Sequence, residues 1–200
     1  MSRIILLPGI HTSPHSRRML EMREHIERGS ELDTLYHEYG DIFAIETRWK
    51  NPGIAKELLP LIRIGDVLVG HSNGCAILKR CLDLGAPAVG WVCLNGALKD
   101  NIEIPWQVRF MHVYYNKRDD VVPLTNFPVL RKLAFDPFWG DMGRDGYTGK
   151  DLRVWQLDCG STDDAQPDLV GHSSIIDPAN SKAWGEFIGI QIKAALKEIA

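Results

Sequence analysis

Residues 67–78 read Val67-Leu68-Val69-Gly70-His71-Ser72-Asn73-Gly74-Cys75-Ala76-Ile77-Leu78. The apolar residues 67–69 are typical of a buried strand, and the four residues after Gly74 favour a helix. Between them, Ser72 stands in a G-x-S-x-G pattern, in which a sharp strand-to-helix turn lifts the serine hydroxyl above the sheet edge. Glycines suit the flanking positions because side chains there would collide with neighbouring backbone. Ser72 is therefore a candidate nucleophile, with an ordinary turn as the alternative.

Apolar runs of strand length alternate with helical patterns on both sides of this segment. Further strands are predicted at Ile4–Leu7, Ile42–Ile45, Val89–Leu94, Val108–Tyr115 and Leu152–Leu157. Helices are predicted to begin near Ser13, Asn51 and Asn73, and apolar residues at helical spacing mark a last helix over Trp184–Ile199. This alternation indicates an α/β architecture with about six mostly parallel strands and helices on both faces of the sheet.

The composition is that of an ordinary globular protein, with 200 residues of which 44% are hydrophobic and 24% charged. A chain of this length is expected to fold as a single domain over residues 1–200. The net charge of −3 disfavours a nucleic acid as partner. No apolar run approaches the roughly 20 residues of a membrane span. We therefore expect a cytoplasmic protein without a membrane span, and the oligomeric state stays open.

The chain has four cysteines, at Cys75, Cys81, Cys93 and Cys159, and none of them forms a CxxC pair. This spacing does not indicate a zinc site or a thioredoxin-type motif. Three of the four lie within apolar runs, where cysteine behaves as a small hydrophobic residue. We expect free structural thiols in a reducing compartment.

A glycine-containing turn follows the first predicted strand and reads Pro8-Gly9-Ile10-His11-Thr12. Gly9 allows a tight turn at the carboxyl edge of the sheet, where Ser72 is also expected. The backbone N–H groups of Ile10 and Asn73 are candidate donors to a developing oxyanion at that edge. The alternative is a plain loop between a strand and a helix.

An acid and a histidine stand at the ends of later strands. Residues 116–123 read Asn-Lys-Arg-Asp-Asp-Val-Val-Pro, and a carboxylate at this strand end can orient a histidine. Counting back from the Val-Val-Pro turn favours Asp119, and Asp120 is the alternative. His172 lies in Gly171-His172-Ser173-Ser174 and follows Ser72 and the acid in chain order. A neutral imidazole there can accept the serine proton and pass it to a leaving group.

These segments together resemble the α/β-hydrolase superfamily, and the resemblance covers Ile4–Ile199. It rests on Pro8-Gly9, the pattern around Ser72, Asp119–Pro123 and Gly171-His172. It implies a triad of Ser72, Asp119 and His172, and the chain length is similar to that of small serine hydrolases without a sizeable lid. Two departures are present. The two leading strands of larger members are absent, and Pro8 stands where many members carry a histidine.

Residues 124–150 are predicted to form an irregular insertion rich in Gly, Pro, Asp and aromatic residues. Long loops are often functional, and Trp139, Met142 and Tyr147 are candidates to line an acyl or aryl pocket, with His11 as a fourth. The alternative is a surface connection whose aromatic residues anchor it. The acidic loops lack calcium-loop spacing, so neither a metal nor another cofactor is expected.

The pattern leads to the hypothesis of a serine hydrolase that cleaves a carboxylic ester or related acyl bond of a small-molecule substrate. The acyl-enzyme would form on Ser72. One alternative is an acyltransferase that uses the same triad, which product analysis with competing alcohols or amines would distinguish. The other is a non-catalytic binding module on the same fold, because a fold does not by itself give a function.

Overall fold

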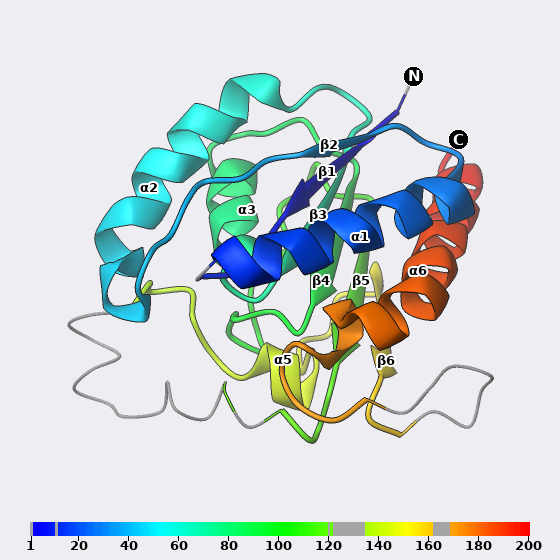
Figure 1. The fold of residues 1–200 in the computed structure, drawn as a ribbon. Coiled ribbons are helices and arrows are strands. Elements are labelled where there is room, and N and C mark those ends of the chain that lie inside the picture. The colour runs from blue at the N-terminus through cyan, green and yellow to red at the C-terminus, as the bar shows by residue number, and fades with distance from the viewer. Residues whose placement is uncertain (1, 11, 120, 122–134, 162–168) are drawn as a thin grey trace.

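The computed structural model describes residues 2–10, 12–119, 121, 135–161 and 169–200, and for residues 12–17 it describes the backbone alone. One sheet of six strands forms the centre of the described structure, in the order β2-β1-β3-β4-β5-β6 (Figure 1). The strands are β1 (Ile4–Leu7), β2 (Thr34–Tyr36), β3 (Val67–His71), β4 (Gly90–Leu94), β5 (Phe110–Tyr115) and β6 (Val154–Asp158). Every neighbouring pair is parallel, which confirms the predicted fold class.

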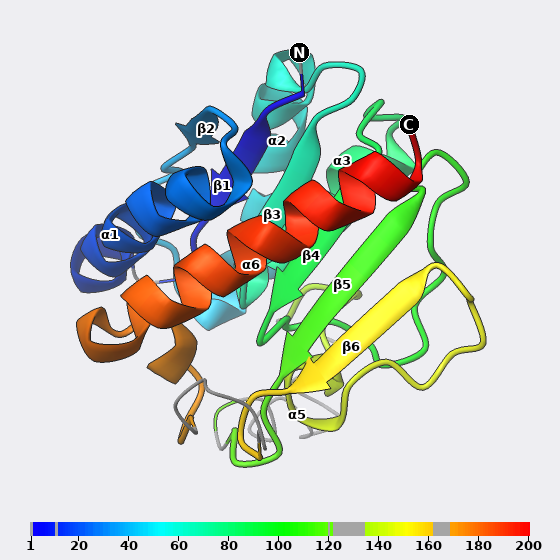
Figure 2. The same ribbon diagram turned by 90° about the vertical axis from the view of Figure 1, so that its right-hand side faces the viewer.

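Helices cover both faces of the sheet. One face carries α1 (Thr12–Ser30) and α6 (Pro178–Glu198), and the other carries α2 (Thr47–Leu58) and α3 (Asn73–Asp83). Figure 2 shows α1 and α6 lying side by side in front of the sheet, with α3 behind it. A parallel sheet needs this double cover because its strands are apolar on both faces.

The side chains of the central strands alternate between the two helix layers. Ile5 and Leu7 of β1 pack in the core beneath α2 and α3, whereas Ile4 and Leu6 pack in the core beneath α1 and α6. All four are fully buried. The alternation follows from the two-residue period of an extended strand, and it explains why the strand sequences are continuously apolar.

The predicted strand at Ile42–Ile45 is wrong. The chain forms a 3-10 turn at Ala44–Glu46 there, and the Glu46 carboxylate accepts a hydrogen bond from the backbone N–H of Phe43 at 2.8 Å. Ile42 is buried, but Phe43 and Ile45 are 60% and 57% exposed, so the run is apolar without belonging to the sheet. The edge position is taken instead by β2, whose three half-buried residues leave too short a pattern to recognise.

The predicted helices form, α3 begins at Asn73 as predicted, and α2 differs from the prediction at its start. α2 begins at Thr47, four residues before the predicted start, so that Pro52 lies inside it. It ends at Leu58, and residues Leu59–Leu61 continue as a 3-10 turn that contains Pro60, which has no backbone N–H to extend an α-helix. Among the described residues, no helix is both long and apolar enough to cross a membrane.

The expected insertion at 124–150 is described only from residue 135 onward. This part contains the short helix α5 (Met142–Asp145), which lies near the carboxyl end of β5. Two backbone hydrogen bonds of 2.8 Å tie it to the chain after β4, from Lys99 N–H to Phe138 C=O and from Met142 N–H to Leu98 C=O. The described part of the insertion is therefore anchored to the body of the protein.

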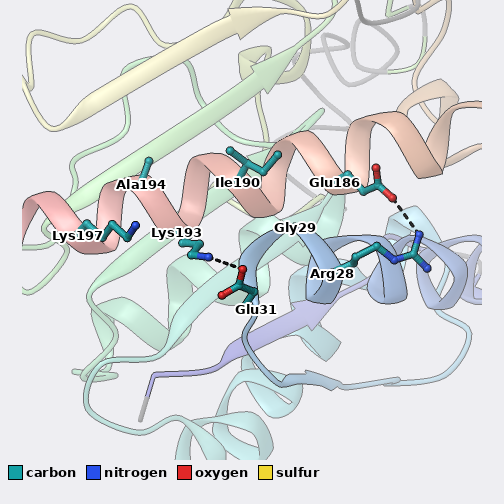
Figure 3. A pocket seen from close by; sticks show the side chains of 8 residues that line it. All are labelled: Arg28, Gly29, Glu31, Glu186, Ile190, Lys193, Ala194 and Lys197. Carbon is teal, nitrogen blue, oxygen red and sulfur yellow. Dashed lines mark hydrogen bonds and ion pairs between the residues drawn. The ribbon is translucent and has the colours of Figure 1, made fainter.

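A shallow groove runs along α1 and α6 on the outer side of their layer (Figure 3). Two ion pairs lie there. Arg28 of α1 and Glu186 of α6 have an N–O distance of 3.0 Å, and Lys193 of α6 lies 2.5 Å from Glu31, the residue after α1. None of the residues that line the groove belongs to a loop that follows a strand's carboxyl end. The groove is therefore separate from the candidate site.

Candidate active site

Ser72 occupies the turn between β3 and α3 at the carboxyl edge of the sheet. Its backbone has φ 52° and ψ −121°, a conformation that side-chain-bearing residues rarely adopt. Such a backbone costs on the order of 1–3 kcal/mol and persists only when the surroundings enforce it. Strain of this kind occurs at functional sites, and here it coincides with the serine of the G-x-S-x-G pattern.

The two glycines of the pattern are required by close backbone contacts. A Cβ built on Gly70 would lie 2.8 Å from the backbone nitrogen of Cys75, and one built on Gly74 would lie 2.7 Å from the carbonyl oxygen of Leu7. Real Cβ atoms do not approach backbone atoms so closely. The sequence pattern therefore has a direct steric cause, because Gly70 lies against the first turn of α3 and Gly74 lies against the end of β1.

Three side chains distant in the sequence form a hydrogen-bonded series. His172 Nε2 lies 2.7 Å from Ser72 Oγ, and His172 Nδ1 lies 2.6 Å from Asp119 Oδ2. Ser72 is 8% exposed and Asp119 is 2% exposed, so both interactions are largely shielded from water. With the Nδ1 proton directed at Asp119, Nε2 is free to accept the proton of Ser72.

Asp119 is held by several neighbours. Its Oδ1 accepts a hydrogen bond from the Val121 backbone N–H at 3.0 Å, and its own N–H donates to the Asn116 carbonyl at 2.8 Å. The buried Asn95 amide lies 3.5 Å from Oδ2. These contacts orient the carboxylate toward His172. Asp120, the alternative acid, lies outside the described residues.

Asn116 joins the loop of the acid to the loop of the histidine. It is fully buried, and its side-chain amide donates to the carbonyls of Leu169 and Gly171, each at 3.3 Å. Its side-chain oxygen accepts from the backbone N–H of Arg118 at 2.9 Å. Sequence reasoning did not single out Asn116, although a polar residue directly after a buried strand was a usable signal.

His71, the variable residue before Ser72, contacts the loop of His172. Its ring centroid lies 5.3 Å from that of His172, and its Nε2 lies 3.3 Å from the His172 carbonyl oxygen. The pair therefore brings the end of β3 against the histidine loop. The G-x-S-x-G pattern carries no information about this contact, since its second position accepts any residue.

The two candidate oxyanion donors come from different segments: Ile10 from the loop after β1, and Asn73 from the start of α3. A Cβ built on Gly9 would lie 3.0 Å from Ser72 Cβ and 3.5 Å from its Oγ, so the loop after β1 passes beside the serine. Ile10 follows Gly9 directly. Asn73 is the first residue of α3, where a helix supplies no acceptor for the backbone N–H. Both N–H groups thus belong to segments that adjoin the serine.

A buried polar network holds the side chain of Asn73. Asn73 and Asn51 exchange side-chain hydrogen bonds of 2.8 and 3.1 Å, and the indole N–H of Trp139 donates to Asn73 Oδ1 at 2.9 Å. Asn51 also donates to the fully buried carboxylate of Asp136 at 2.7 Å, and Arg80 donates to the same carboxylate at 2.9 and 3.1 Å. The network joins α2, α3 and the insertion through the side chain of Asn73, the residue that follows Ser72.

The pocket candidates occupy different environments. Trp139 is buried and stacks on Phe135 with ring centroids 5.1 Å apart, and Met142 is fully buried in the same core cluster. Tyr147 is half-buried, and its backbone N–H donates to the side chain of Gln156 on β6 at 2.7 Å. These positions fit the anchoring interpretation of the aromatic residues in the insertion. His11 lies outside the described residues.

The four cysteines take no part in the hydrogen-bonded series that contains Ser72. All four cysteines are buried and unbridged, and burial raises the pKa of Cys81 to about 12. Burial also raises the pKa of the Cys93 thiol, and a hydrogen bond with the neighbouring Cys75 thiol adds to this effect. Buried thiols of this kind are inert structural residues. No group of three or more His, Cys, Asp or Glu side chains within the described ranges could hold a metal ion.

Comparison with known proteins gives structural relatives alone. No protein-family model and no curated protein matches the chain. It superposes on a candidate hydrolase of the α/β superfamily from Xanthomonas campestris pv. campestris, with TM-score 0.55, 15% identity, and coverage of 97% of this chain and 99% of that one. The mouse alpha/beta hydrolase domain-containing protein 10 matches with TM-score 0.58, 11% identity, and coverage of 98% and 90%.

The esterase domain of a Rhodothermus marinus protein matches with TM-score 0.54 and 11% identity, covering 98% of this chain and 87% of that domain. In each case nearly the whole of both chains is aligned. At these identities the likeness concerns the fold, and activity has to be argued from the site itself.

Proposed function

On the premise that the chain has the α/β-hydrolase fold, we propose that it is a serine hydrolase that cleaves a carboxylic ester or a related acyl bond. The observation that carries the proposal is the unbroken series of hydrogen bonds from Ser72 Oγ through His172 to Asp119, at 2.7 and 2.6 Å. The strained backbone of Ser72 supports it, because the turn is maintained at a cost in stability.

The first half of the reaction acylates Ser72. Its Oγ attacks the carbonyl carbon of the substrate while its proton passes to His172 Nε2, and Asp119 stabilises the resulting imidazolium. The carbonyl oxygen becomes an oxyanion, which the N–H groups of Ile10 and Asn73 bind. The tetrahedral intermediate then expels the alcohol, which takes the proton from His172, and the acyl group remains on Ser72.

The second half of the reaction releases the acyl group. Water attacks the ester carbonyl of the acyl-enzyme while His172 Nε2 accepts its proton, and the same two N–H groups bind the second oxyanion. Collapse returns the proton from His172 to Ser72 Oγ and frees the carboxylic acid. The enzyme ends in the state in which it began, and one water is consumed for each ester bond that is cleaved.

The test is covalent labelling with a fluorophosphonate, which reacts with an activated serine. The wild-type protein is expected to label at Ser72, as mapped by peptide mass spectrometry, and Ser72→Ala is expected not to label. Ser181→Ala is the matched control, because Ser181 is a buried serine in α6 rather than in a loop that carries Ser72, Asp119 or His172, and its hydroxyl donates to the Pro178 carbonyl at 3.4 Å. Labelling that persists in Ser72→Ala, or a folded wild-type protein that does not label, would contradict the proposal.

The range of substrates is read from a panel of p-nitrophenyl esters of increasing acyl length. The described part of the insertion packs into the core through Trp139 and Met142. We therefore expect turnover of short acyl chains, and an optimum at long chains would show a deeper pocket than this packing provides.

A further inference from the structure

Tyr39 lies in the segment between β2 and α2, outside any helix or strand. Its ring packs against the core cluster beneath α2 and α3. Its hydroxyl lies 2.7 Å from the carbonyl oxygen of Gly9 and 2.9 Å from that of Pro8. The hydroxyl is thus directed at the loop after β1, the loop that carries the candidate oxyanion donor Ile10.

The contact with Gly9 bears directly on Ile10. The Gly9 carbonyl and the Ile10 N–H are the two polar groups of one planar peptide unit, and in a trans peptide they point in opposite directions. A hydrogen bond at the carbonyl therefore determines where the N–H points. It also polarises the peptide, which makes the N–H a stronger donor. Gly9 needs such a restraint because glycine leaves the adjacent peptide units freest to rotate.

The same peptide unit adjoins the nucleophile. A Cβ on Gly9 would lie 3.0 Å from Ser72 Cβ, so a side chain at this position would crowd the serine. A rotation of the unit would therefore redirect the Ile10 N–H within the immediate surroundings of Ser72. One donor of an oxyanion site must be held in direction as well as in position, since the hydrogen bond weakens steeply away from linearity.

The surroundings of Tyr39 keep its hydroxyl neutral. Burial raises the pKa of Tyr39 well above its usual range, and a side-chain hydrogen bond with Asn73 opposes this only in part. The hydroxyl thus keeps its proton at any pH suitable for an ester assay. The geometric contacts of the phenol are those with the Pro8 and Gly9 carbonyls, in the loop that carries Ile10.

We propose that Tyr39 is a positioning residue for the oxyanion: its hydroxyl, bound to the Gly9 carbonyl, directs the Ile10 N–H. The inference rests on the proposed function. The carbonyl oxygen of bound substrate is neutral, and it becomes charged only as Ser72 attacks. Loss of the hydroxyl therefore destabilises the transition state more than it weakens substrate binding.

The experiment compares Tyr39→Phe with the wild-type protein on the p-nitrophenyl ester that the wild type hydrolyses fastest. Active sites are counted by complete titration with a fluorophosphonate, so that a misfolded fraction does not enter kcat. We expect kcat to fall about 10- to 100-fold, less than the loss of a whole oxyanion donor, with KM changed by less than about twofold. A trifluoromethyl ketone, whose adduct with Ser72 carries the oxyanion, is expected to lose affinity by a similar factor.

Two further variants separate positioning from simple support of the fold. Tyr114→Phe is the matched control: the Tyr114 hydroxyl is buried on β5 and has no hydrogen-bond partner among the described residues. Its kcat is expected to equal that of the wild type. Replacing Tyr39 by 4-aminophenylalanine keeps the ring and restores an N–H donor, and it is expected to recover most of the lost kcat.

The outcomes are distinguishable. A titratable, active wild type with an unchanged kcat in Tyr39→Phe would overturn the role of Tyr39 and leave the proposed function standing. A loss in Tyr39→Phe that 4-aminophenylalanine does not recover would likewise overturn it, because the loss would then not depend on a hydrogen-bond donor at this position. A folded wild type that neither labels nor hydrolyses any ester of the panel would overturn the proposed function and the role of Tyr39 with it.

Discussion

His172 Nε2 lies 2.7 Å from Ser72 Oγ, although the two residues are 100 positions apart in the chain. The loop after β6 brings the histidine to the end of β3, across the width of β4 and β5. The contact depends on the carboxylate behind the histidine, since Asp119 accepts from the other ring nitrogen at 2.6 Å. Changes at either end of this series should therefore affect activity far more than stability.

Asp119→Asn tests the orientation of the histidine. An amide N–H facing His172 Nδ1 favours the tautomer with its proton on Nε2, which cannot accept the proton of Ser72. We expect kcat for a p-nitrophenyl ester to fall by about a thousandfold or more, with a similar fold of the protein by circular dichroism. Asp145→Asn, an exposed carboxylate on α5 paired with Arg144, is the control and should retain full activity. A loss of less than tenfold at Asp119 would exclude its role as the acid.

The backbone strain at Ser72 predicts an inverted order of stability. Ser72→Ala and Ser72→Gly both remove the hydroxyl, but the alanine still has a Cβ at φ 52°. We expect the glycine variant to be more stable than the alanine variant by about 1 kcal/mol, measured by urea denaturation. At most positions the order is the reverse because glycine makes the unfolded chain more flexible. Equal stabilities would mean that the turn relaxes once the hydroxyl is gone.

Two glycine-to-alanine changes in helices should have opposite signs. At Gly74 of α3 the new Cβ would lie 2.5 Å from the Pro8 carbonyl oxygen, whereas at Gly53 of α2 no atom lies within 4 Å. We expect Gly74→Ala to lower the free energy of unfolding by about 2 kcal/mol or more. Gly53→Ala should raise it by about 0.5–1 kcal/mol, because alanine favours the helix. Thermal and urea denaturation of both variants test the close packing of the turn against β1.

Stability should depend on pH through His112. Burial lowers the pKa of His112 from 6.5 to about 4, and its ring lies between Phe110 and Trp155 with centroids 5.2 Å from each. At a pH between about 4 and 6.5, His112 is protonated in the unfolded chain and neutral in the native protein. The free energy of unfolding therefore falls as the pH is lowered from about 6.5 to 4, by about 3 kcal/mol from this group.

His112→Phe isolates that contribution. Phenylalanine fills the site without titrating, so the difference in unfolding free energy between variant and wild type should grow as the pH falls from 7 to 4.5. The measurement is a urea denaturation series at fixed ionic strength. His37→Phe is expected to change in the same direction with pH, because burial lowers the pKa of His37 as well. A difference for His112→Phe that does not change with pH would show that the native protein accommodates the charged ring.

Features that depend on residues close together in the sequence were predicted well. The strand, turn and helix around Ser72 follow from one short segment, and the alternation of apolar runs was sufficient for the parallel sheet with helices on both faces. The run at Ile42–Ile45 was misread because a strand and an irregular apolar segment of this length share the same composition. The edge strand β2 was missed because only three residues pair with β1.

By itself, then, the sequence determined the fold class, the sharp turn at Ser72 and the strand ends at which polar residues gather, because the period of a strand or helix is a local property. The chain order and the resemblance also predicted that His172 acts on Ser72. The tertiary structure alone decided that Asn116 ties the acid loop to the histidine loop and that Tyr39 reaches Gly9. Tyr39 belongs to no periodic element, and its hydroxyl finds its acceptor only when β1 and the segment after β2 pack together.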